Sequence, residues 1–113
     1  MEYTPDRWVI VKYTHPKRKP EYKVLGGWSG GYTTGDSWRM NSGITSMKET
    51  ETAYEFTGYS GSVYVCRKGG YGMNMIMSSI LKNFESDLAK ADKTIKQTVL
   101  SEDTDFTKIA WRT

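Results

Sequence analysis

The spacing of apolar residues changes once along the chain, at Gly72. Before Gly72, short runs rich in β-branched and aromatic residues alternate with polar ones and are separated by Gly, Pro, Asn and Ser, which is typical of strands and turns. After Gly72 the apolar residues recur at helical spacing and fall on one stripe: Met73, Met77, Ile80, Leu81, Phe84, Leu88, Ala91, Ile95 and Val99. Strands followed by a helix predict the α+β class rather than alternating βαβ units.

The strand-like part predicts one strongly curved antiparallel sheet of five or six strands within about residues 7–67. Its expected strands are 7–13, 21–28, 36–41, 44–49, 52–57 and 62–68. The nearly continuous apolar run from Trp8 to Val11 indicates a central strand covered on both faces. We expect the other face of the sheet, opposite the helix, to remain free and to carry the function.

The helix is expected at about residues 73–99, near the C-terminal end and packed on one face of the sheet. The segment 92–94 could instead break it into two helices. The tail 101–113 is of mixed character, and its FTKIAW segment could add an edge strand. At 113 residues, the chain 1–113 is expected to form a single domain.

Composition bounds the class of protein. The fifteen aromatic residues (four Trp, eight Tyr and three Phe) favour a sheet-dominated core and argue against disorder. With one cysteine, Cys66, no disulfide can form within the chain, which favours a reducing compartment. No apolar run is long enough for a membrane span, and the first residues lack the pattern of a signal peptide. We therefore expect a cytoplasmic protein with no membrane partner.

Residues with catalytic or metal-binding chemistry are few. His15 is the only histidine, so Cys66 has no second histidine to activate it, and one Cys with one His does not make a zinc site. Glu102, Asp103 and Asp105 lack the spacing of a calcium loop. The glycines between residues 26 and 35 are not followed by the Gly-Lys-Ser/Thr of a P-loop. We expect no enzyme, no cofactor and no metal.

The composition of the glycine-rich and aromatic stretch from Leu25 to Ile44 makes it the candidate binding site. Trp and Arg are enriched among residues that dominate binding energy, and an arginine presents five donors in a fork. The candidate partner-binding residues are Trp28, Tyr32, Asp36, Trp38, Arg39 and Asn41. Two other interpretations remain: the tryptophans are core residues of a β-meander, and Asp36 and Arg39 form a local structural ion pair.

Positive charge is concentrated near the start of the chain. Residues 1–23 hold six basic and three acidic side chains, which account for the whole net charge of +3. A second function therefore remains open, a nucleic-acid or nucleotide binder that stacks bases on the same aromatics and contacts phosphates through basic side chains. Those phosphate-binding candidates are Lys17, Arg18, Lys19 and Lys23. A plain solvated turn would explain the same cluster.

The segments WSGGY, DSWRMNSGI and GYSGSVY, with the YxV-like strands between Arg7 and Gly72, resemble small uncharacterised proteins of tailed bacteriophages. The resemblance implies a protein made in the cytoplasm of an infected bacterium. It also implies a non-enzymatic protein that binds and inhibits a host protein, in host takeover or anti-defence. The same free face would allow a homodimer.

Overall fold

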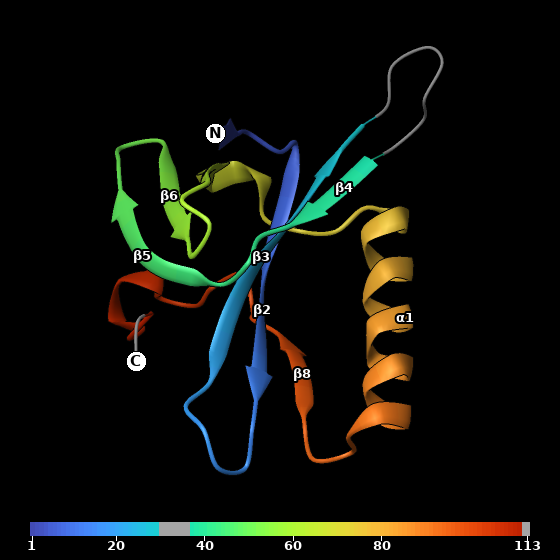
Figure 1. Cartoon of the computed structure of the whole chain (residues 1–113). Helices are drawn as coiled ribbons and strands as arrows, with labels where there is room; N and C mark the ends of the chain where they lie inside the picture. The colour runs from blue at the N-terminus through green and yellow to red at the C-terminus, as the bar shows by residue number, and fades with distance from the viewer. Residues whose placement is uncertain (30–36, 112–113) are drawn as a thin grey trace.

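The computed structural model describes residues 1–29 and 37–111, which form two four-stranded sheets and one α-helix stacked in layers (Figure 1). One sheet, here called the central sheet, has the order β4 (Ser37–Met40), β3 (Glu21–Trp28), β2 (Arg7–Thr14) and β8 (Lys96–Val99). The other, the meander sheet, has the order β1 (Glu2–Tyr3), β7 (Val63–Arg67), β6 (Ala53–Gly58) and β5 (Ile44–Glu49). All pairs are antiparallel except β1 with β7. The fold is α+β.

The six strands expected between residues 7 and 68 are confirmed, but the single curved sheet is wrong. After β4 the chain does not return beside β4; it turns at Asn41–Gly43 and crosses to the meander sheet. Gly43 has φ of 134°, a conformation that side chains disfavour. The ring of Tyr59 lies 2.7 Å from where a Cβ would stand at Gly43. The turn therefore requires glycine at residue 43. It directs the chain away from β4, so that β5 joins the second sheet.

The expected helix to residue 99 is also wrong: α1 spans Met75–Ala91 and lies within the chain, followed by β8. At its start the side chain of Asn74 accepts a hydrogen bond from the backbone N–H of Met77 at 3.0 Å, an N-cap. At its end Asp92 takes an extended conformation, and its carboxylate accepts from the N–H of Thr94 at 2.9 Å. This turn ends the helical conformation, so the chain continues as an extended strand, β8 (Lys96–Val99).

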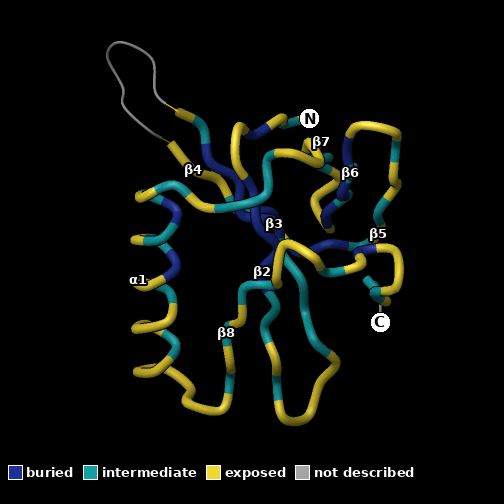
Figure 2. Tube along the Cα trace, turned by 180° about the vertical axis from the view of Figure 1, so that it is seen from behind, coloured by how far each residue is buried: buried dark blue, intermediate teal, exposed yellow. Residues whose placement is uncertain are grey.

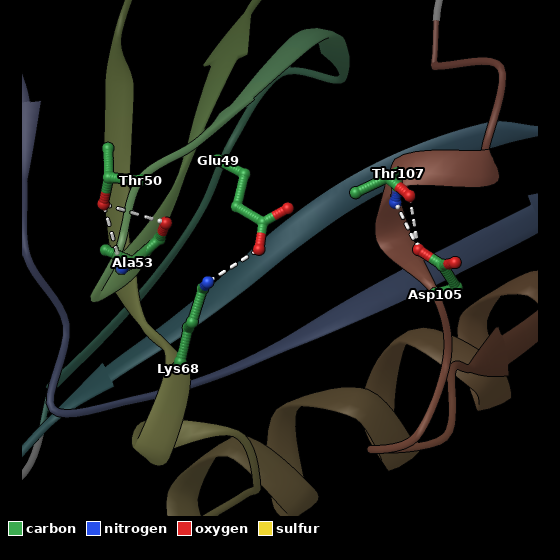
Figure 3. Close-up of polar contacts among 6 residues, drawn as sticks. All are labelled: Glu49, Thr50, Ala53, Lys68, Asp105 and Thr107. Atoms are coloured by element: carbon green, nitrogen blue, oxygen red, sulfur yellow. Dashed lines mark hydrogen bonds and ion pairs between the residues drawn. The ribbon is translucent and has the colours of Figure 1, made fainter.

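The C-terminal segment folds as a short 3-10 helix, η2 (Phe106–Lys108), and not as the edge strand that its FTKIAW segment could have added. The carboxylate of Asp105 accepts hydrogen bonds from the N–H and the hydroxyl of Thr107, and Thr50 closes the turn between β5 and β6 in a similar local way (Figure 3). Figure 3 also shows the exposed ion pair between Lys68 and Glu49, at 2.6 Å. The cap on η2 directs Phe106 into the core, where it is 3% exposed.

Two apolar cores lie on opposite faces of the central sheet. The core between the sheets contains Trp8, Ile10, Val24, Ile44, Phe56, Tyr64, Cys66 and Phe106. The core beneath α1 contains Val9, Val11, Leu25, Met77 and Leu81. Alternate residues of β2 thus belong to different cores, which confirms the expectation of a strand covered on both faces. The buried part of β2 lies at the centre of the molecule (Figure 2). The face opposite the helix is therefore not free, because the meander sheet covers it.

Candidate partner-binding surface

Strand β4 directs its candidate residues to opposite sides of the central sheet. The ring of Trp38 points to α1 and meets the ring of Phe84 edge to face, with centroids 5.8 Å apart. The guanidinium of Arg39 lies on the other side, 4.5 Å from the ring centroid of Tyr3. Successive side chains of a strand alternate in this way. Trp38 and Arg39 therefore do not form one continuous patch.

Trp28 lies on the same side as Arg39. Its ring packs against Tyr3 at 6.3 Å, and its indole N–H donates to the carbonyl of Thr4 at 3.1 Å. Tyr3 in turn packs on Tyr64 at 5.1 Å. Burial raises the pKa of Tyr64 to about 12 although the positive charge of Arg39 acts in the opposite direction. This cluster joins the N-terminal strand to the central sheet and leaves Arg39 at the surface.

The remaining candidates in the Leu25–Ile44 stretch are differently placed. Asn41 is only 6% exposed, and its side-chain oxygen accepts from the backbone N–H of Val24 at 2.9 Å. Its position is that of a residue that supports β3, not of one that meets a partner. Tyr32 and Asp36 lie outside the described residues, as does any ion pair of Asp36 with Arg39.

The structure reveals a groove that the sequence did not indicate, here called the α1 groove. The first half of α1 buries Met77 and Leu81, whereas Phe84 and Leu88 in its second half stay partly exposed. A hollow of about 340 Å³ opens there between the helix and the central sheet. Its lining comes from β2, the turn after it, β3, β4, α1 and the segment before β8: Tyr13, His15, Glu21, Lys23, Met40, Phe84, Asp87, Leu88 and Ile95. Phe84 links the groove to Trp38.

The chemistry of the α1 groove is apolar at its centre and charged at its rim. Met40, Phe84, Leu88 and Ile95 supply the apolar part. At the rim, Lys23 and Glu21 are paired at 3.6 Å, and Arg18 contacts the Nδ1 of His15 at 3.0 Å. Burial, followed by the nearby charge of Glu21, raises the pKa of Tyr13 to about 12, so this hydroxyl stays protonated and donates to Gln97. Such a groove suits an apolar side chain flanked by polar groups.

The basic candidates lie at the far end of the central sheet from Trp28. The turn between β2 and β3 exposes Lys17, Arg18 and Lys19. This turn adjoins the first residue of β3, whereas the last residue, Trp28, pairs with the start of β4 (Figure 1). An eight-residue strand is about 26 Å long at 3.3 Å per residue. Lys23 lies on the helix side, in the α1 groove. The basic turn and the glycine-rich aromatics therefore do not form one compact surface.

Groups capable of catalysis are poorly placed within residues 1–29 and 37–111. Cys66 is fully buried, and burial raises the pKa of its thiol, so the reactive thiolate is disfavoured. In that part of the chain no three His, Cys, Asp or Glu side chains gather in a metal-binding arrangement. The described residues also contain no helix long and apolar enough to cross a membrane.

Comparison of the chain with protein-family models, curated proteins and solved structures gave no match. The resemblance to phage proteins therefore stays a prediction, and function must be argued from the surfaces themselves.

Proposed function

We propose that this chain is a small non-enzymatic binding protein, phage-encoded, that docks on a host bacterial protein through Trp38 and the α1 groove and so inhibits it. The observation that carries the proposal is the exposed Trp38–Phe84 ring pair at the edge of an apolar hollow. Trp38 is 38% exposed, a large fraction for an indole. It lies on β4, which is at one edge of the described part of the central sheet. Tryptophan is enriched among the residues that dominate the binding energy of protein interfaces, and such residues pack in pockets near the interface centre.

The partner that fits this surface is an extended segment with an apolar side chain. Within residues 1–29 and 37–111, β4 pairs with β3 alone, and such an edge can pair with a strand from another chain. A segment running along β4 would pass Trp38 and reach the α1 groove, where Met40 and Phe84 would contact its apolar side chain. The charged rim at Glu21, Lys23 and Asp87 would then fix polar groups on either side.

A pull-down from bacterial lysate, with and without nuclease, tests the proposal. The wild-type protein should retain a host protein after nuclease treatment. Trp38→Ala should weaken the purified complex about thirtyfold, since an interface centre contributes about 2 kcal/mol or more. Met75→Ala is the matched control, because Met75 is 87% exposed on the helix and does not line the groove.

Both variants must keep the wild-type unfolding temperature for the comparison to count. Equal retention by Trp38→Ala and wild type would contradict the proposed surface. Loss of all retained material with nuclease would contradict a protein partner and favour nucleic acid.

A further inference from the structure

A second hollow, here called the Trp111 pocket, lies at the basic turn, next to the start of β5 and the C-terminal segment. Its volume is about 390 Å³. Three aromatic rings line it, from Tyr22, Tyr59 and Trp111. Two cations, Arg18 and Lys19, stand at the same pocket. These residues come from three separate parts of the chain, which the fold alone brings together.

The rings of the pocket are held in place by the core. Trp111 packs edge to face on Tyr22 and on Phe56, at 5.3 Å from each. Tyr59 lies on Gly43, where the missing side chain leaves room for its ring, yet it stays 64% exposed. The pocket thus combines a fixed indole with an exposed phenol ring, both available before any ligand arrives.

The charge at the pocket is positive on balance. Arg18 and Lys19 are exposed, and they belong to the basic turn at the N-terminal end of the chain. Glu21 also lines the pocket, but its carboxylate is paired with Lys23 at 3.6 Å. An anionic group near Arg18 and Lys19 would therefore meet more positive than negative charge.

We propose that the Trp111 pocket binds a ligand of the nucleotide class, with the base against Tyr59 and Trp111 and the phosphate beside Arg18 and Lys19. Bases stack on aromatic side chains whatever their sequence, and arginine forms strong charge-assisted hydrogen bonds to phosphate. The volume lies in the range of small-ligand sites. The same chemistry recognises a free nucleotide and a nucleotide within a single strand.

The centre of this site differs from that of the protein-docking surface, although Glu21 lines both hollows and Arg18 contacts His15 of the α1 groove. Lys23 and Trp38 lie on the helix side of the central sheet, whereas Tyr22 packs in the core between the sheets. It also uses other aromatics than the glycine-rich stretch. The two proposals can therefore fail independently.

The test is calorimetric titration of the full chain with four probes: ATP, inorganic triphosphate, adenosine and a short oligothymidine. A nucleotide site requires ATP or the oligothymidine to bind more tightly than triphosphate or adenosine, because base and phosphate both contribute. Tighter ATP binding would identify a free nucleotide as the ligand, and tighter oligothymidine binding a single strand. Triphosphate binding as tightly as ATP and the oligothymidine would overturn the proposal, as would the absence of binding up to about 10 mM.

Variants then locate the site. Tyr59→Ala should weaken binding of the tighter probe about tenfold, the usual loss of one stacking ring. Arg18→Gln with Lys19→Gln should weaken it further and reduce its dependence on salt between about 50 and 200 mM. The control is Lys90→Gln with Lys96→Gln, which removes the same charge at exposed positions outside the pocket. Equal weakening by both double variants would overturn the site, as would unchanged binding by Tyr59→Ala in a folded protein.

Discussion

The sulfur of Met77 lies 2.6 Å from the position that a Cβ would occupy at Gly27, and the Cγ of Met77 lies 2.9 Å from it. The side-chain nitrogen of Asn74, the helix cap, stands 3.0 Å away. Glycine at this point of β3 thus lets the first turn of α1 pack directly on the strand. We expect Gly27→Ala to lower the free energy of unfolding by about 1–3 kcal/mol through overpacking, measured by urea denaturation.

Gly69→Ala is the control for that substitution. No atom lies within 4 Å of a Cβ at Gly69, so the change should stay within about 0.5 kcal/mol. If Gly27→Ala and Gly69→Ala had the same stability, the close contact between β3 and α1 would be refuted.

A substitution of Asn41 distinguishes a residue that stabilises β3 from one that contacts a binding partner. Asn41→Ala should destabilise the protein by about 1–3 kcal/mol, because it leaves the buried N–H of Val24 without its acceptor. Ser46→Ala, at an exposed position of β5, should have little effect on the same urea curve. Wild-type stability combined with lost partner binding would show instead that Asn41 meets the partner.

Alkaline pH should destabilise the fold through Tyr13 and Tyr64. Both have a pKa of about 12 in the folded chain against 10.0 for a free side chain, chiefly because burial disfavours the charged form. The unfolded state therefore loses these protons first, so the stabilisation is complete below pH 10 and is lost as the pH rises towards 12. Urea denaturation at several pH values should show this decline, together with ultraviolet absorbance of the phenolate.

Tyr13→Phe isolates the contribution of Tyr13 to the loss of stability at alkaline pH. It should lower stability at neutral pH, since the hydrogen bond to Gln97 is lost, but it should make the alkaline decline shallower. A stability that does not change from pH 10 to 12 would contradict the burial of these hydroxyls.

Cys66 should be protected from thiol reagents in the native state. Its side chain is fully buried, and burial raises the pKa of its thiol, so reaction must wait for opening of the core. We expect labelling to be slower than in urea by on the order of a hundredfold or more. Fast labelling of the folded protein would place Cys66 outside the core between the sheets, and Cys66→Ala gives the background.

Six of the eight described strands, β2 to β7, were predictable because their signal is local, whereas β1 and β8 were not predicted. In β2 and in β5 to β7, alternating or apolar runs between turn residues located the strands. The alternative break at residues 92–94 is where α1 ends, but strand β8 was not predicted, because Leu88, Ile95 and Val99 keep a spacing that suits a helix as well as a strand. Only the turn at Asp92 excludes the helix, and its geometry depends on a hydrogen bond to Thr94.

The two pockets were harder to foresee because their residues are far apart in the sequence. The α1 groove combines Tyr13, Met40 and Ile95, and the Trp111 pocket combines Arg18, Tyr59 and Trp111. No window of the chain contains either set. The sequence predicted the basic turn, but not that Tyr59 and Trp111 lie beside it.

The sequence by itself determined the six strands before Gly72 and the middle of the helix, and which side chains share one face of each, since those properties follow from backbone periodicity over a few residues. Only the tertiary structure decided that β5 leaves β4 to begin a second sheet, and that this sheet covers the face opposite α1. The reason is physical: burial of a face is settled by contacts between distant segments, such as Trp8 with Phe106, and no local pattern specifies them.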